Sequence, residues 1–190
     1  TSPKPEGGKP KTEPNSLAVE FTVTPDAEPG VRDFRIATPQ GISTVGQIVI
    51  VVDPVPYGRG NDTLDRAQEL RLPATVCGAL EKSEDVDYFK FHVEGGTSLV
   101  FHVRSARIQD RIHDLQQHSD PVLTLRNSSG VPLAENDNYF AGDPLLVHRF
   151  DQPGDFVIEV RDARFIGNAY WEYSLEIHSR PFIETVFPLA

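Results

Sequence analysis

The sequence has little of several features that would assign a protein to a chemical class. Cys77 is the only cysteine among the 190 residues, which excludes an internal disulfide and any metal site built from several cysteines. It stands in "PATVCGAL", a strand-like run in which a cysteine is typically a small buried residue. The apolar runs are all far shorter than the roughly twenty residues that a membrane-spanning helix needs, so membrane insertion is not expected.

Positive charge is also scarce. The chain has 18 lysines and arginines against 28 aspartates and glutamates, a formal net charge of −10. Basic residues form no run outside the proline-rich N-terminal segment, which disfavours a nucleic-acid partner. The surplus of carboxylates suits a soluble surface and, in clusters, divalent cations.

Sequence motifs of common enzyme classes are missing. The chain contains no G-x-S-x-G, no H-E-x-x-H, no phosphate-binding loop and no dinucleotide glycine fingerprint. The "NSSG" at residues 127–130 predicts a turn between strands, and no histidine stands near it in the sequence. The sequence therefore predicts no enzyme activity and no certain cofactor.

What the sequence does contain is many short apolar runs separated by turns. Its 16 prolines and 14 glycines predict an all-β chain. Residues 1–16, rich in proline, glycine and charge, predict an extended linker. The runs "LAVEFTVT", "VRDFRIAT" and "GQIVIVV" predict three strands within residues 17–52. Residues 53–62 then predict a hinge, and "DTLDRAQEL" predicts a short helix.

Residues 63–180 predict a β-sandwich of the jelly-roll kind. We expect its strands at about 73–80, 87–93, 97–106, 120–126, 145–150, 155–162 and 170–178.

Two of these strands, in "YFKFHVEGGTSLVFHV", predict a hairpin around Gly95 and Gly96. Three apolar residues of each strand would face those of the other: Phe89, Phe91 and Val93 against Leu99, Phe101 and Val103. His92 and His102 would then lie diagonally on the outward face, where solvated histidines are expected more often than a metal pair.

Aromatic residues gather in the last strand. Tyr170, Trp171 and Tyr173 are expected to be packing residues, and an exposed strip of them would instead hold a polymer ligand.

The order of several segments resembles a known module. "ND-T", "DVDYFKF", "PVLTLRNSSGVPLAENDN", "PGDFVIEVRD" and "YSLEI" follow one another as in the bacterial pre-peptidase C-terminal domain, a secreted β-sandwich appended to extracellular peptidases and large surface proteins. The resemblance spans about residues 60–180. Residues 17–52 resemble the closing part of an immunoglobulin-like module, and residues 181–190 resemble the first strand of another module.

This resemblance implies a location and a role. The chain would be a non-catalytic accessory module of a larger secreted or cell-surface bacterial protein, serving adhesion, spacing or substrate docking. Its partners would be other domains of the same parent chain and an extracellular protein or polysaccharide. Two alternatives remain open: a structural subunit or linker of a cell-surface assembly, and a processed pro-segment of an extracellular peptidase.

The resemblance also implies a calcium site. The related collagen-binding domains of clostridial collagenases bind calcium through an acidic linker and through acids before a "D-x-F-x-F" strand. By position, the corresponding residues here are Asn61, Asp62, Glu84 and Asp87. Their oxygens are the hard ligands that calcium prefers.

Two departures weaken that expectation. Arg59 stands where the linker of those relatives has a glutamate, and Tyr57 occupies another acidic position. We therefore expect at most a weak calcium site, with Arg59 as the fixed charge that neutralises the acids. A second role is open for Asp87, as a carboxylate that accepts backbone N–H groups where the loop meets the strand.

Overall fold

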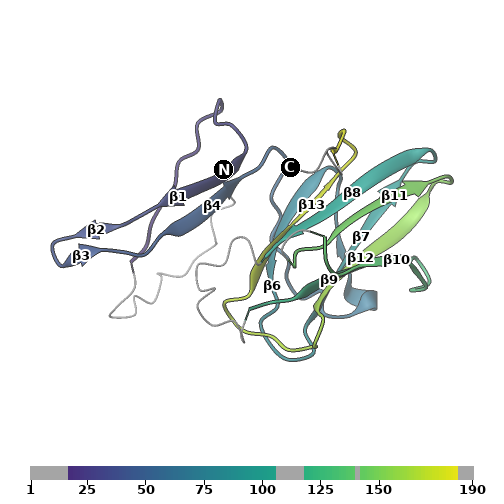
Figure 1. Ribbon diagram of the computed structural model, residues 1–190. Coiled ribbons are helices and arrows are strands. Elements are labelled where there is room, and N and C mark those ends of the chain that lie inside the picture. The colour runs from purple at the N-terminus through teal and green to yellow at the C-terminus, as the bar shows by residue number, and fades with distance from the viewer. Residues whose placement is uncertain (1–16, 106–117, 140–141, 184–190) are drawn as a thin grey trace, which may run out of the picture.

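The structure is a computed structural model that describes residues 17–105, 118–139 and 142–183. The predicted linker at residues 1–16 lies outside the described residues, as do residues 184–190 of the segment predicted to begin a further module. The described chain forms a narrow N-terminal ribbon that projects from a β-sandwich (Figure 1). This confirms the predicted all-β fold.

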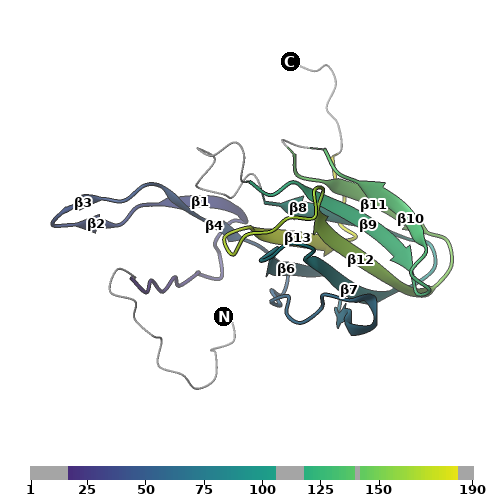
Figure 2. The same ribbon diagram turned by 90° about the horizontal axis from the view of Figure 1, so that it is seen from below.

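Two sheets make up the sandwich, and they lie face to face in both views (Figures 1 and 2). The five-stranded sheet has the order β10-β9-β12-β7-β5, with bounds Pro132–Asn136, Pro121–Asn127, Gly154–Asp162, Val86–Val93 and Gln68–Glu69. The four-stranded sheet has the order β11-β8-β13-β6, with bounds Leu145–Phe150, Thr97–Arg104, Glu172–His178 and Ala74–Ala79. Neighbouring strands run antiparallel except for β5 and β7.

Alternation of buried and more exposed side chains in β7 shows how the sequence builds the core. In β7, Phe89 and Phe91 are fully buried, whereas Lys90 between them is exposed. The Phe91 ring meets the Phe101 ring of β8 across the two layers, with centroids 5.5 Å apart. Each such buried side chain contributes about 1.5–3 kcal/mol relative to an exposed one, so this period-two pattern selects the sandwich.

The predicted hairpin between β7 and β8 is wrong. β7 pairs with β12, whereas β8 pairs with β11 and β13 in the opposite sheet. The apolar side chains face one another as expected, but they do so across the core, because β7 and β8 belong to opposite sheets that both turn these side chains inward. His92 and His102 consequently lie on opposite outer faces of the sandwich and cannot share a metal.

The ribbon consists of β1 (Gly30–Phe34) and β4 (Gly46–Ile50), extended by the short β2 (Ala37–Thr38) and β3 (Gly41–Ile42). Among the described residues, β1 and β4 pair only with each other. The strand predicted within residues 17–24 does not form, because no neighbouring strand pairs with it there. That the ribbon belongs to an immunoglobulin-like module stays a prediction.

The predicted helix is also wrong. Only one 3-10 turn forms, η1 (Leu64–Arg66), and the chain then enters β5. The Leu70 N–H donates to the Lys90 carbonyl at 2.8 Å, so the backbone is drawn to the edge of β7 instead of continuing a helix. In the described part of the chain, no helix is long and apolar enough to cross a membrane.

Candidate functional site

A cavity of about 380 Å³ opens beside the start of β7, and we call it the acidic cavity. One wall is the hinge, which runs along β6: the Gly58 N–H donates to the Cys77 carbonyl at 2.8 Å. The hinge then reaches β7, where the Tyr88 N–H donates to the Asn61 carbonyl at 2.9 Å. These backbone bonds bring residues 57–62 against the turn that precedes β7.

Three of the four predicted calcium ligands line this cavity, and one does not. Asn61, Asp62 and Asp87 belong to its wall, whereas Glu84 is exposed and lies outside it. Glu84 has a φ of 62°, a left-handed conformation within the tight turn. Asp85 takes its place in the wall, because it is two residues from Asp87 and shares that residue's buried face.

Asp85 is one of the three acids in "SEDVDYF", but the resemblance did not assign it as a calcium ligand. Its carboxylate is buried and accepts the Glu81 N–H at 2.6 Å. The backbone-binding role considered for Asp87 therefore belongs to Asp85. The period-two spacing of Asp85 and Asp87 was the available signal, since it places both side chains on one face.

Asp87 is a buried carboxylate with a side-chain partner. Tyr173 of β13 donates its hydroxyl proton to it from the opposite sheet. Burial raises the pKa of Asp87 to about 6; the Tyr173 hydrogen bond lowers it, and the charges of Asp85 and Asp62 add to the rise. The pKa of Tyr173 is raised well above its ordinary value, first by burial and then by the charge of Asp87. Gly78 permits this contact, because a Cβ there would overlap the Tyr173 ring and hydroxyl.

Asn61 lies beside Asp87 with its amide almost completely buried. Neither its Nδ2 nor its Oδ1 has a hydrogen-bond partner among the described residues. The amide still favours the charged form of Asp87 and so opposes the rise in that group's pKa. An unsatisfied buried amide is destabilising, and a bound water or ion would relieve it.

Lys82 supplies the positive charge that lies beside the carboxylates of the acidic cavity. Its Nζ lies 2.7 Å from Asp62 Oδ2 and 3.9 Å from Asp85 Oδ1. The pKa of Lys82 is raised, first by its hydrogen bond to Asp62. The predicted neutralising residue, Arg59, instead lies over the Tyr57 ring, with its Cζ 4.9 Å from the ring centroid.

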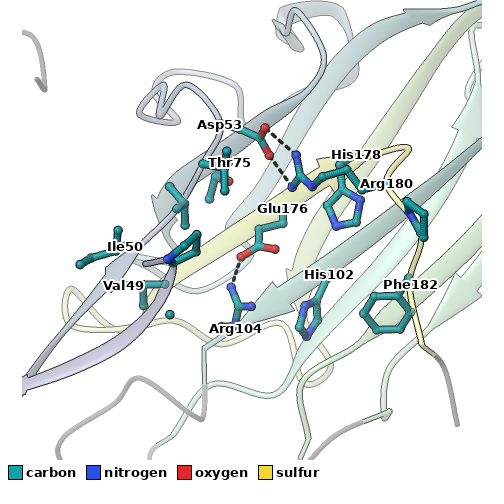
Figure 3. Close-up of a pocket in the computed structure, with 15 residues that line it drawn as sticks. Val49, Ile50, Asp53, Thr75, His102, Arg104, Glu176, His178, Arg180 and Phe182 are labelled. Carbon is teal, nitrogen blue, oxygen red and sulfur yellow. Dashed lines mark hydrogen bonds and ion pairs between the residues drawn. The ribbon is translucent and has the colours of Figure 1, made fainter. Parts of the chain in front are cut away.

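A second cavity, of about 370 Å³, lies where the ribbon meets the sandwich, and we call it the junction cavity (Figure 3). Arg180 donates two hydrogen bonds of 2.7 Å to the two carboxylate oxygens of Asp53. Arg104 pairs with Glu176 on the outer face of the four-stranded sheet. The two positive and two negative charges cancel, so the cavity does not select an ion of either sign.

Two histidines of the outer sheet face, His102 and His178, also line the junction cavity and are buried. Burial, together with the nearby Arg180, lowers the pKa of His178 and favours its neutral form. The aromatic residues of the last strand lie elsewhere and form no strip. Trp171 and Tyr173 are buried in the core, as expected of packing residues, and Tyr170 alone of the three is exposed.

No protein-family model matches the sequence, and no curated protein matches it. Among solved structures, the pre-peptidase C-terminal domain of collagenase from Bacillus anthracis is similar, with 16% identity, a TM-score of 0.43, and 58% of this chain and 93% of that chain covered. PliG of Aeromonas hydrophila, a periplasmic inhibitor of g-type lysozyme, is similar at 11% identity and a TM-score of 0.38, over 67% of this chain and 100% of that one. Values this low do not establish a family, so membership of the pre-peptidase C-terminal family stays a prediction.

Proposed function

We propose that the chain is a non-catalytic spacer module of a larger secreted or cell-surface bacterial protein. The observation that carries this proposal is the pair of Asp53 and Arg180 (Figure 3). Asp53 lies where the chain passes from the ribbon to the sandwich, and Arg180 lies just after β13. The pair therefore ties the two ends of the sandwich together, which fixes the direction of the ribbon.

The geometry of this pair favours a structural role. The Asp53 side chain is only 5% exposed, and the planar guanidinium meets both of its oxygens. A bidentate pair holds its two residues in one relative orientation, which a single lysine contact would not do. A module that spaces neighbouring domains needs such a rigid joint.

In both cavities, charged side chains are engaged in ion pairs rather than poised for chemistry. Arg104 and Arg180 are paired with carboxylates, and Lys82 is paired with Asp62. Burial raises the pKa of Cys77, the one thiol, which keeps it in its unreactive protonated form. These features support a role without catalysis.

Small-angle X-ray scattering of the complete chain tests the spacer role. Arg180→Gln should increase the maximum dimension or broaden the pair-distance distribution, because the ribbon is released. The matched control is Arg149→Gln, which breaks an exposed pair with Asp151 far from the ribbon. Identical curves for all three proteins would contradict the role. Hydrolysis of a peptide or glycan by the purified chain, abolished by one acid-to-alanine change, would contradict the absence of catalysis.

A second candidate function is a structural subunit of a surface assembly. Four alternate residues before the ribbon are apolar and 45–66% exposed: Leu17, Val19, Phe21 and Val23. A two-stranded ribbon with open edges is a place where another chain can pair. Light scattering at increasing protein concentration decides this: a mass that stays monomeric argues against the assembly, and a concentration-dependent rise favours it.

A further inference from the structure

The calcium site implied by the resemblance can be tested against the acidic cavity itself. Calcium requires about six to eight oxygen ligands at 2.3–2.6 Å. Glu84 lies outside the cavity, Asp62 is bound by Lys82, and Asp87 is hydrogen-bonded to Tyr173. In the described part of the chain, no group of three or more His, Cys, Asp or Glu side chains is arranged to hold a metal. The donor set does not fit the ion.

We propose that the Lys82 ammonium takes the place of calcium in this cavity and ties the hinge to the sandwich without a metal. An ion in such a site would bridge oxygens of the hinge to oxygens of the turn before β7. Lys82 Nζ does the same, at 2.7 Å from Asp62 on the hinge and 3.9 Å from Asp85 on the turn. The ammonium has three donors for such acceptors and carries its charge permanently at neutral pH.

The backbone of Lys82 is held in position for this contact. Glu84 donates its N–H to the Phe165 carbonyl at 2.9 Å, and Asn168 donates to the Leu80 carbonyl at 2.9 Å. Between them, Gly167 packs so closely on the backbone of Lys82 that a Cβ at residue 167 would overlap it. The backbone of the turn is thus clamped on both sides, which places the start of the exposed Lys82 side chain within reach of Asp62.

The buried Asn61 amide is the observation that favours an occupant in the cavity. One water molecule that reaches the Asn61 amide from the cavity meets that need, because it supplies both a donor and an acceptor. Calcium would in addition have to displace Lys82 from Asp62 or approach its positive charge. Arg59 adds a second basic side chain beside Lys82. Both basic residues line the same cavity.

Melting of the complete chain in millimolar calcium and in chelator tests the proposal, with Lys82→Met as the variant. Lys90→Met is the matched control, because Lys90 forms an exposed pair with Glu69 at 3.7 Å outside the cavity. We expect the wild-type melting temperature to be the same in both buffers. Lys82→Met should melt about 1–3 °C lower than the control, the range for a surface pair in a domain of this size.

A local measurement accompanies the melting curves. The Tyr88 N–H reports the docking of the hinge, since it donates to the Asn61 carbonyl. Its hydrogen exchange should be at least threefold faster in Lys82→Met, whereas exchange of the Gly96 N–H, bonded to the Phe150 carbonyl, should not change. Asp62→Asn should produce the same acceleration, and the double variant should add nothing to it. The hydrogen-exchange measurement remains decisive if the difference in melting temperature is small.

Two results would overturn the proposal. One is a rise of the wild-type melting temperature with calcium that is lost in Asp87→Asn, which would place the ion in the cavity. The other is hydrogen exchange of the Tyr88 N–H that is unchanged in both Lys82→Met and Asp62→Asn. That result would show that the pair of Lys82 and Asp62 does not hold the hinge against the sandwich. Neither result bears on the spacer role, which depends on Asp53 and Arg180.

Discussion

Arg180 donates two hydrogen bonds of 2.7 Å to Asp53, a residue 127 positions earlier in the chain. The hydrogen bonds join the segment between ribbon and sandwich to the segment that follows the last strand. Arg180 is partly exposed, whereas the Asp53 carboxylate is buried. Losing the guanidinium therefore leaves an uncompensated buried charge, and losing the carboxylate leaves a cation that water can reach.

This asymmetry predicts unequal effects of the two single substitutions. Arg180→Gln should lower the free energy of unfolding by about 1–3 kcal/mol, and Asp53→Asn by less. Urea denaturation of both variants and of the double variant measures this. Equal effects of the two substitutions would show that Asp53 is not desolvated in solution.

The raised pKa of Asp87 predicts how stability changes with pH. The folded protein binds a proton at Asp87 up to about pH 6, whereas an unfolded aspartate releases it near 3.8. Between these values the native state holds more protons, so the free energy of unfolding contributed by Asp87 falls as the pH rises, by about 2–3 kcal/mol in total. Above pH 6 this contribution is constant.

Asp87→Asn isolates that contribution, because the amide still accepts the Tyr173 hydroxyl but does not titrate. Urea denaturation in chelator from pH 4 to pH 7 should show wild type losing stability relative to Asp87→Asn as the pH rises. A constant difference between the two proteins across this range would mean that the Asp87 pKa is not raised.

Gly78 should be intolerant of substitution. The Cβ of Gly78→Ala would overlap the Tyr173 side chain and push its hydroxyl away from Asp87, so we expect a loss of about 1–3 kcal/mol. Gly154→Ala is the control, since the nearest atom to its Cβ would be 3.4 Å away in the Phe156 ring. Thermal melts that rank the two variants equally would contradict the close contact.

The ribbon should be the least stable part of the described chain. A two-stranded sheet is marginal by itself, and β1 and β4 bury little of their surface. Hydrogen exchange should be fast throughout β1 and β4 and slow in β12, which lies between β9 and β7. Protection of β1 equal to that of β12 would show that the ribbon is covered in solution.

The strands of the sandwich could be predicted because their side chains alternate. "DYFKFHV" has one apolar face, and it forms β7 as expected. The partner of each strand could not be predicted in the same way, because apolar residues that face each other across a hairpin or across a core have the same pattern. Gly96, with a φ of 80°, is compatible with a hairpin turn within one sheet and equally with a turn that leads from one sheet to the other.

The candidate site was predicted in part. The resemblance grouped Asn61, Asp62 and Asp87, and all three line the acidic cavity because the hinge is hydrogen-bonded to the start of β7. Which basic side chain reaches the acids depends on the shape of the turn before β7. That turn directs Lys82 to Asp62, and Arg59 rests on Tyr57 instead.

The joint between ribbon and sandwich is the centre of the spacer proposal, and a distance between spin labels tests it most directly. Labels at Gln40→Cys, at the ribbon tip, and Ser128→Cys, in the turn after β9, would be placed in a Cys77→Ser background; both positions are exposed. Pulsed electron spin resonance should give one narrow distance distribution, which broadens in Arg180→Gln and not in Arg149→Gln. A distribution that is already broad with Arg180 in place, or one that Arg180→Gln leaves narrow, would contradict a joint fixed by Asp53 and Arg180.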